Sequence, residues 1–259
     1  MNMNAMKSIV LKVGVGVGAG MVLAALATAH AAEIKVISSV GVKAALEQLK
    51  PEFERITSHK LTLIWGSAVP LKRQIDAGAT FDVAILTPGM IDELVKVGKV
   101  AAGSKTDVAK VGMGVTGRVG AAQPDISTTE AFKRALLDAR LITHSKEGLS
   151  GTYTASVIER LGIAAQMKPK TVLETRSGHT PVAVVEGKAD LGLCLISEIL
   201  PVAGATFIGP FPPELQTYAM FTAGISATAS DAQAAKAFVQ FFSVPLALPI
   251  LKSTGMEPG

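Results

Sequence analysis

The sequence predicts an α/β fold in which mainly parallel sheets carry helices on both faces. Strand-like and helix-like runs alternate from Glu33 to the C-terminal end, which is the pattern of such folds. Hydrophobic residues make up 49% of the chain and charged residues only 18%, as expected where a sheet is buried on both faces. The length of 259 residues allows one large domain or two smaller lobes.

In the first half, apolar periodicity separates three strands from three helices. A helix over 42–56 places Val42, Leu46 and Leu49 on one face, and we expect Pro51 to kink it. Glycines end the next two helices. The predicted strands are 33–39, 60–65 and 82–87, and the predicted helices are 42–56, 70–78 and 90–98.

In the second half, Ser127 and Glu130 form a capping-box pattern that opens a helix. Ser230 or Asp231 is the expected N-cap of the last clear helix. Two long extended runs, near 108–117 and 215–225, have no turn signal and are predicted to cross between two lobes. The remaining strands are 140–144, 170–175, 189–197 and 216–226, and the helices are 130–139, 152–162, 180–187 and 230–243.

The N-terminus has the pattern of a secretory signal peptide over 1–31. Lys7 and Lys12 precede an uncharged apolar stretch, and "AHA" at 29–31 supplies small residues for cleavage before Ala32. A transmembrane anchor is the alternative, for which the stretch is marginal in length. Its removal leaves 23 basic against 21 acidic residues, so the mature protein is close to neutral.

Charge and cysteine content argue against several classes of protein. Basic residues are not interleaved with aromatic ones, which argues against nucleic-acid binding. Cys194 is the single cysteine, so neither a disulfide nor a cysteine metal site is available, and we expect it to be a buried hydrophobic residue. His59, His144 and His179 show no metal-pair spacing. Export into a bacterial periplasm fits these features.

Four strand-to-helix junctions are small, bear hydroxyls or glycine, and carry no acid. Ligands of open α/β sheets sit at the carboxyl ends of the strands, where helix N-termini offer unpaired N–H groups and partial positive charge. Together such ends bind an anion without lysine. The candidate residues are Ser38, Ser39, Val40 and Gly41; Ser67 and Ala68; Ser150, Gly151 and Thr152; and Gly178, His179 and Thr180.

Each candidate also has a plainer interpretation. Serine and threonine are ordinary N-caps, worth about 1 kcal/mol each, although the absence of Asp from all four junctions favours a shared site. Arg176 would pair bidentately with a carboxylate or oxyanion, or would lie on the surface. Tyr153 and Trp65 adjoin candidate junctions and are expected to pack.

Two further motifs are weaker evidence for a functional site. Residues 112–117 match GxGxxG but no helix follows, as a dinucleotide site requires. A secreted serine hydrolase is the alternative of another class; it would need Ser39 or Ser150 beside His144 or His179, with an orienting acid. "GLSGT" lacks the GxSxG spacing of a nucleophile elbow.

Several blocks resemble the periplasmic molybdate-binding protein family, which comprises solute receptors of ABC importers. They are "PLKRQIDAGATFDVAILTP", "GLSGTYTASVIERLGI", "VVEGKADLGLCLISEI" and the C-terminal "AKAFVQFFSVPLALPILKSTGMEPG". The resemblance covers 33–257 and implies a type II periplasmic binding protein fold, in which hydroxyls and backbone N–H groups from such junctions hold an oxyanion. Here Gly41 stands at the family's first-loop serine and Leu195 at its late tyrosine.

The resemblance therefore implies a monomeric, periplasmic receptor that is no enzyme and has neither cofactor nor metal. Lobe one would comprise 32–112 with 222–259, and lobe two 113–221. A small anion, molybdate or tungstate first, would bind between the lobes and pass to the membrane permease of an ABC transporter. Because two side-chain contacts of the family are changed, an organic carboxylate held by Arg176 is the alternative ligand.

Overall fold

The computed structural model describes residues 31–259, which form one compact unit. The predicted signal peptide, apart from Ala31, lies outside the described residues. Between residues 31 and 259, no helix combines the length and the apolar character that crossing a membrane requires.

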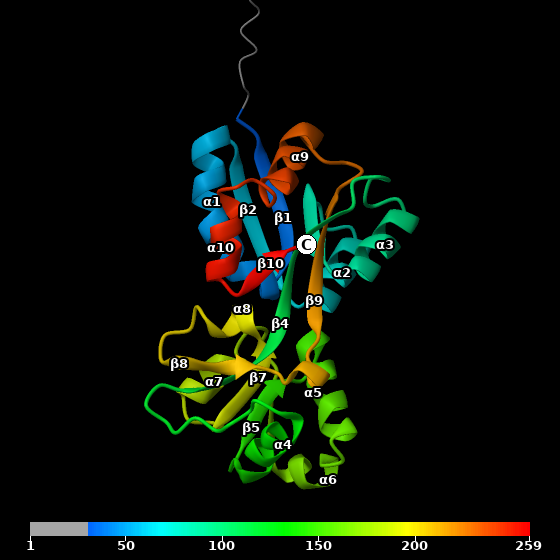
Figure 1. The fold of residues 1–259 in the computed structure, drawn as a ribbon. Helices are drawn as coiled ribbons and strands as arrows, with labels where there is room; N and C mark the ends of the chain where they lie inside the picture. The colour runs from blue at the N-terminus through cyan, green and yellow to red at the C-terminus, as the bar shows by residue number, and fades with distance from the viewer. Residues whose placement is uncertain (1–30) are drawn as a thin grey trace, which may run out of the picture. The chain divides into compact units, whose positions relative to one another are not determined.

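One group of strands contains the first three of the chain (Figure 1). β1 pairs in parallel with β2 on one side and β3 on the other, so the carboxyl ends of all three lie at one edge. β3 is buried along its whole length, as its sequence Val-Ala-Ile-Leu requires. The elements are β1 (Glu33–Ser39), β2 (Lys60–Gly66), β3 (Val83–Leu86), α1 (Lys43–Thr57), α2 (Ala68–Asp76) and α3 (Pro88–Lys96), with a 3-10 turn η1 (Val40–Val42) before α1.

The second group is built around a parallel trio in the order β7-β5-β6. Helices again follow strands, so a second set of carboxyl ends is formed. The elements are α4 (Thr129–Asp138), β5 (Ile142–Ser145), α5 (Gly148–Arg160), α6 (Ala164–Met167), η2 (Lys168–Lys170), β6 (Thr171–Glu174), α7 (Thr180–Val185), β7 (Leu191–Leu195), α8 (Ile196–Ile199), β8 (Ala205–Pro210) and η3 (Pro213–Leu215).

Two long antiparallel strands, β4 (Thr106–Arg118) and β9 (Tyr218–Ile225), join the groups side by side (Figure 1). The first half of β4 pairs with β9 and the C-terminal β10 (Met256–Pro258), while its second half pairs with β7 and β8. The predicted extended runs are therefore confirmed as strands. The lobe boundaries at 112/113 and 221/222 stay a prediction.

The C-terminal helices α9 (Ala232–Phe241) and α10 (Ala247–Ser253) return to the first group. Phe53 of α1 meets Phe238 and Phe241 of α9 edge-on, with ring centroids 5.3 and 5.4 Å apart. This aromatic contact closes the core over α1, which continues through Pro51 as a helix.

Some local expectations were wrong. The capping box at Ser127 does not form, because α4 begins one residue later with Thr128 as its cap, whose Oγ1 accepts the Ala131 N–H at 3.1 Å. Of the two caps expected for α9, Asp231 is confirmed, whereas Ser230 donates to Asp82 at 2.7 Å. Helix α5 begins at Gly148, before the predicted start at Thr152. The elements that the sequence did not indicate are α6, α8, β8, α10 and β10.

Candidate ligand-binding cleft

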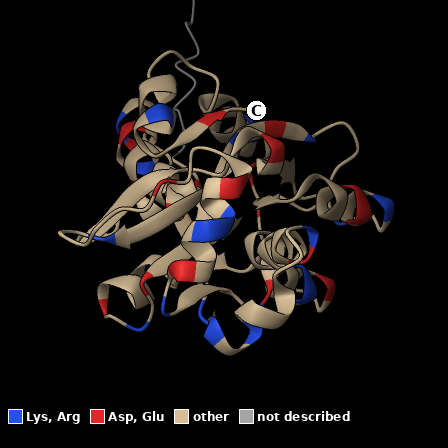
Figure 2. Ribbon diagram, turned by 60° about the horizontal axis from the view of Figure 1, so that its bottom comes forward, with Lys and Arg blue, Asp and Glu red and all other residues tan. Residues whose placement is uncertain are grey.

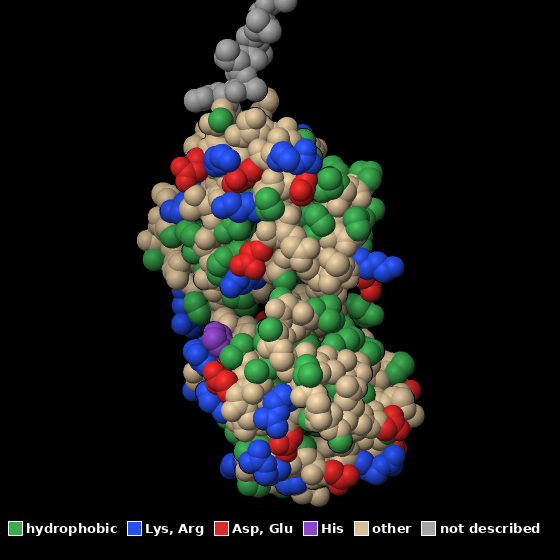
Figure 3. Space-filling model, turned by 90° about the vertical axis from the view of Figure 1, so that its left-hand side faces the viewer, with side chains coloured by type: hydrophobic (Ala, Val, Ile, Leu, Met, Phe, Trp, Pro, Cys, Tyr) green, Lys and Arg blue, Asp and Glu red, His purple; other side chains and the backbone are tan. Residues whose placement is uncertain are grey.

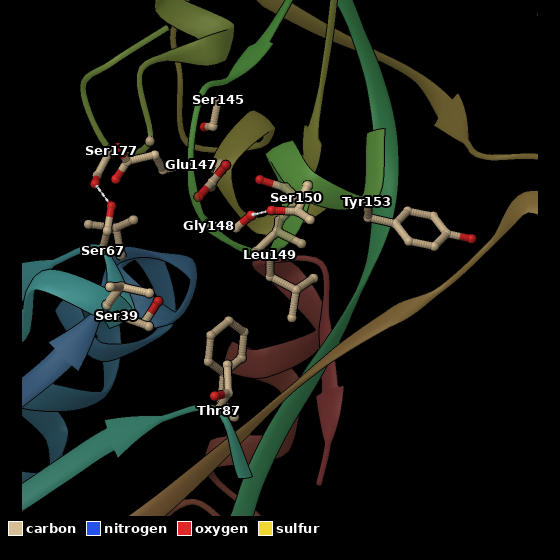
Figure 4. A pocket seen from close by; sticks show the side chains of 18 of the residues that line it. Ser39, Ser67, Thr87, Ser145, Glu147, Gly148, Leu149, Ser150, Tyr153 and Ser177 are labelled. Atoms are coloured by element: carbon tan, nitrogen blue, oxygen red, sulfur yellow. Dashed lines mark hydrogen bonds between the residues drawn. The ribbon is translucent and has the colours of Figure 1, made fainter. Parts of the chain in front are cut away.

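A cavity of about 570 Å³ opens where the carboxyl ends of the two parallel groups face each other. In Figure 4, Ser39, Ser67 and Thr87 lie on one side, and the residues from Ser145 to Ser150 with Ser177 on the other. Ser67 Oγ and Ser177 Oγ are hydrogen-bonded to each other across the opening. The four junctions singled out in the sequence thus contribute to one cavity, through Ser39, Val40, Ser67, Ala68, Ser150, Thr152 and Gly178.

Two predicted glycine contacts turn out to serve packing. A Cβ on Gly151 would lie 2.1 Å from the carbonyl oxygen of Ser145, so glycine is needed where α5 approaches β5. A Cβ on Gly41 would lie 2.5 Å from Cζ of Phe221, and the Gly41 carbonyl accepts a hydrogen bond from Ser197 Oγ at 2.7 Å. Neither glycine lines the cavity.

The other four predicted residues outside the cavity wall are Ser38, Arg176, His179 and Thr180. The Ser38 hydroxyl is buried and donates to the Ser39 carbonyl at 3.3 Å. Arg176 is exposed, pairs with Glu174 at 3.4 Å, and borders a smaller neighbouring cavity of about 320 Å³. Thr180 is buried in the first turn of α7 behind His179.

The serine and threonine N-caps around the cavity differ from Thr128 and Asp231, the caps elsewhere in residues 31–259 whose side chains bond their helices. Ser67 precedes α2, Thr87 precedes α3 and Ser39 precedes η1, yet none of their side chains bonds a backbone N–H of its helix. By contrast, the caps Thr128 of α4 and Asp231 of α9, away from the cavity, do so. The capping interpretation therefore fails for Ser39 and Ser67. The Ser67 hydroxyl is instead hydrogen-bonded to Ser177 across the cavity, and a ligand would compete with Ser177 for it.

Residues 34–257 match the family described as bacterial extracellular solute-binding proteins. The chain belongs to this family. Among its relatives, a Pseudomonas protein named aconitate isomerase is 24% identical over 241 residues, covering 90% of each chain. The molybdate-binding protein ModA of Azotobacter vinelandii is 27% identical over 251 residues, covering 93% of this chain and 95% of that one.

Comparison with solved structures agrees with the family match. The structure of the Azotobacter vinelandii periplasmic molybdate-binding protein superposes with a TM-score of 0.74 at 23% identity, covering 87% of this chain and 99% of that one. The α/β fold of the type II periplasmic binding proteins, which the resemblance implied, is thereby confirmed, with parallel trios joined by antiparallel crossing strands.

The wall of this solute-binding protein's cavity contains no lysine, arginine or histidine. Charged residues of both signs are instead spread over the helices and over the face shown in Figure 3, without a large patch of one sign (Figures 2 and 3). Partial positive charge in the cavity comes from the first turns of α2, α3 and α5, whose leading N–H groups have no partner within the helix.

Two carboxyl groups also line the cavity, which the sequence reasoning did not anticipate. Glu147 is the exposed residue before α5. Glu198 lies in the first turn of α8, and burial raises the pKa of its carboxyl group to about 7, although the nearby Leu195 backbone acts to lower it. Its Oε2 is shut off from solvent and has no hydrogen-bond partner among residues 31–259.

The rest of the wall is apolar or aromatic. Tyr153, expected to be a packing residue, lines the cavity, and its hydroxyl donates to the Leu215 carbonyl at 3.0 Å. Leu195, which the resemblance places at the family's late tyrosine, also lines the cavity. The apolar members of the wall are Val40, Ala68, Val69, Met90, Leu149, Leu195 and Phe221.

Some wall residues were missed by the sequence reasoning. Thr87 follows β3 and precedes Pro88 at the start of α3, so the rule that found the other junctions also applies to it. Thr217, Tyr218 and Phe221 reach the cavity from the crossing strand β9 and its entry, and no local signal marks them.

The hydrolase hypothesis lacks its serine–histidine pair. Nδ1 of His144 is 2.8 Å from the carbonyl oxygen of Ser145, and burial lowers the pKa of His144. Within residues 31–259, neither His144 nor His179 is hydrogen-bonded to Ser39 or Ser150.

Proposed function

We propose that this chain is the solute receptor of an ABC importer and that its cleft captures a small organic anion. The observation that carries the proposal is the set of cleft N-caps, Ser39, Ser67 and Thr87, whose hydroxyls leave the helix N-termini uncapped. Carboxylate oxygens would accept hydrogen bonds from these hydroxyls and from the leading N–H groups of α2 and α5.

The apolar part of the wall favours an organic anion over a tetrahedral oxyanion. Molybdate or sulfate presents only oxygen atoms, whereas Met90, Leu149 and Phe221 would contact a carbon skeleton. The cavity of about 570 Å³ has the size of sites for small organic ligands. The relative named aconitate isomerase points to the same class, while ModA keeps molybdate and tungstate as the competing hypothesis.

The importer role is supported by relatives of the same fold, among them a structure titled as the substrate-binding domain of a putative molybdenum ABC transporter from Clostridium difficile. In this role the chain would act in the periplasm as a monomer and deliver its ligand to a membrane permease. Hinge movement between the strand groups would open and close the cleft.

Calorimetric titration of residues 32–259 tests the ligand class. The panel comprises cis- and trans-aconitate, citrate and succinate against molybdate, tungstate and sulfate. We expect binding heat with at least one carboxylate and none with the tetrahedral anions. Saturable binding of molybdate alone would contradict the hypothesis of an organic ligand and favour the hypothesis of a tetrahedral oxyanion.

A matched pair of variants at Ser150 tests the site. Ser150 is 6% exposed and stands in the first turn of α5, on the cavity wall. Ser150→Asp would add a fixed negative charge near the anion and weaken its binding roughly 100-fold or more. Ser150→Asn has nearly the same shape without the charge and should stay within about tenfold of wild type. If the two variants bound the ligand with equal affinity, the start of α5 would not contact the ligand.

An isomerase acting on the same anion is the second candidate, favoured by the 24% identical aconitate isomerase and by Glu198. A carboxyl group with a pKa near 7 suits proton transfer at carbon. Such a step would take a proton from a methylene carbon and return one at the far end of the three-carbon unit as the double bond shifts. Proton NMR of cis-aconitate incubated with the protein detects it; an unchanged spectrum after days would exclude it.

A further inference from the structure

Glu198 is the more deeply buried of the two carboxyl groups that line the cleft. Its Oε2 has no solvent contact and no hydrogen-bond partner among residues 31–259, and burial raises the pKa of the carboxyl group although the nearby Leu195 backbone favours the charged form. A buried carboxyl group with unmet hydrogen-bonding capacity is rare, since such groups are normally satisfied. It lies on the wall of the cavity that would hold the anion.

The charged and titratable groups on neighbouring elements do not neutralise Glu198. Cys194 of β7 is buried, and the carboxyl group raises the pKa of its thiol further. Lys43, at the start of α1, pairs with Glu47 at 3.6 Å, and Lys110 of β4 pairs with Glu257 at 3.3 Å. Arg118 lies at the far end of β4, and His179 precedes α7 outside the cavity wall. The other titratable groups that line the cavity are Glu147, Tyr153 and Tyr218.

We propose that Glu198 binds the anion as a neutral carboxylic acid whose O–H donates to a ligand oxygen, so that capture takes up one proton. The inference rests on the proposed function. An ionised Glu198 would repel an anion in the cavity that it lines, whereas the neutral acid supplies the donor that a lysine would supply in other sites. Because the pKa is already about 7 in the free protein, the neutral form costs little to populate at neutral pH.

Binding of trans-aconitate between pH 5.5 and 9 tests this inference. Neighbouring charges raise the pKa of the last carboxyl group of this probe, so titration of the probe itself is measured with Glu198→Gln and subtracted. We expect Kd to be level below pH 6 and to rise about tenfold per pH unit above pH 7. Calorimetric titrations in buffers that differ in their heat of ionisation should show that the complex takes up close to one proton when it forms at pH 8.

Two variants separate Glu198 from the other cleft carboxylate. Glu198→Gln keeps a neutral donor of the same shape. At every pH we expect its Kd to stay close to the Kd that wild type shows below pH 6, and we expect binding to take up no proton. Glu147→Gln should keep the wild-type pH dependence, because Glu147 is exposed and lacks the buried setting. Loss of the pH dependence in Glu147→Gln instead would overturn the assignment to Glu198.

The outcomes distinguish this inference from the proposed function. A pH-independent Kd for wild type, or carbon-13 NMR of its glutamate carboxyl groups with every midpoint near 4.5, would overturn the neutral-acid role while leaving the receptor intact. Failure of every carboxylate of the panel to bind at pH 6 and at pH 8 would overturn both.

Discussion

At the scale of single residues, Glu198 couples folding to pH. Its pKa is about 7 in the folded protein against 4.5 in the unfolded chain. Between these values the folded state holds the extra proton, so the free energy of unfolding falls as pH rises through this window. The full stability is present below pH 4.5, and up to about 3 kcal/mol is lost by the time pH passes 7.

We therefore expect Glu198→Gln to remove a pH dependence that wild type shows. In urea denaturation, wild type should lose about 3 kcal/mol more than the variant between pH 5 and pH 8. At pH 8 the variant should be the more stable protein, since it carries no buried charge. The same slope in both proteins would show that Glu198 titrates normally.

At the scale of elements, glycine at position 151 decides how closely α5 lies on β5. Its missing Cβ makes room for the carbonyl oxygen of Ser145, which a side chain would meet at 2.1 Å. This contact places the start of α5, with Gly148 and Ser150, at the cavity.

Gly151→Ala should accordingly destabilise the protein by about 2–4 kcal/mol and weaken ligand binding, because backbone has to move. Gly89→Ala is the matched control. Gly89 also lies in a helix, α3, but nothing stands within 4 Å of its added Cβ, so a gain of about 0.5–1 kcal/mol is expected there. Urea denaturation measures the change in the free energy of unfolding for both variants. Equal changes would mean that the backbone around Ser145 moves away from the added Cβ at little cost.

Most long helices were predictable because their apolar periodicity is strong, as in α1, and β3 was predictable as a short, continuously apolar run. The start of α5 was not, because Gly148, Ser150 and Gly151 read as loop residues while tertiary contact with β5 makes them helical. The junction residues of the site were found through strand-end chemistry. Glu198 was missed because its burial depends on how α8 packs against η1 and β4, which no local pattern reveals.

At the scale of the whole described unit, β4 and β9 are the strands that join the two parallel groups. The hydrogen bond between Ser67 and Ser177 joins the same groups at the mouth of the cavity. Ligand entry by hinge movement would separate these two serines.

Oxidation of the double variant Ser67→Cys/Ser177→Cys should lock the cleft. The two side chains are in contact, and Cys194 is buried, so it would not compete for the new thiols. We expect binding of the best carboxylate of the panel to slow at least tenfold in stopped-flow measurements and to recover with dithiothreitol, whereas Ser67→Cys alone should respond to neither treatment. Unchanged rates after oxidation would show that the ligand enters by another route.

The absence of cationic side chains from the cleft wall also bears on how such a receptor changes over generations. Its attraction for negative charge resides in peptide groups, which persist whatever side chains mutation supplies. If the cleft binds anions as proposed, substitutions at Met90, Leu149 or Phe221 would alter which molecule it binds without erasing its preference for negative charge. Single substitutions would then suffice to diversify the bound solutes within one scaffold.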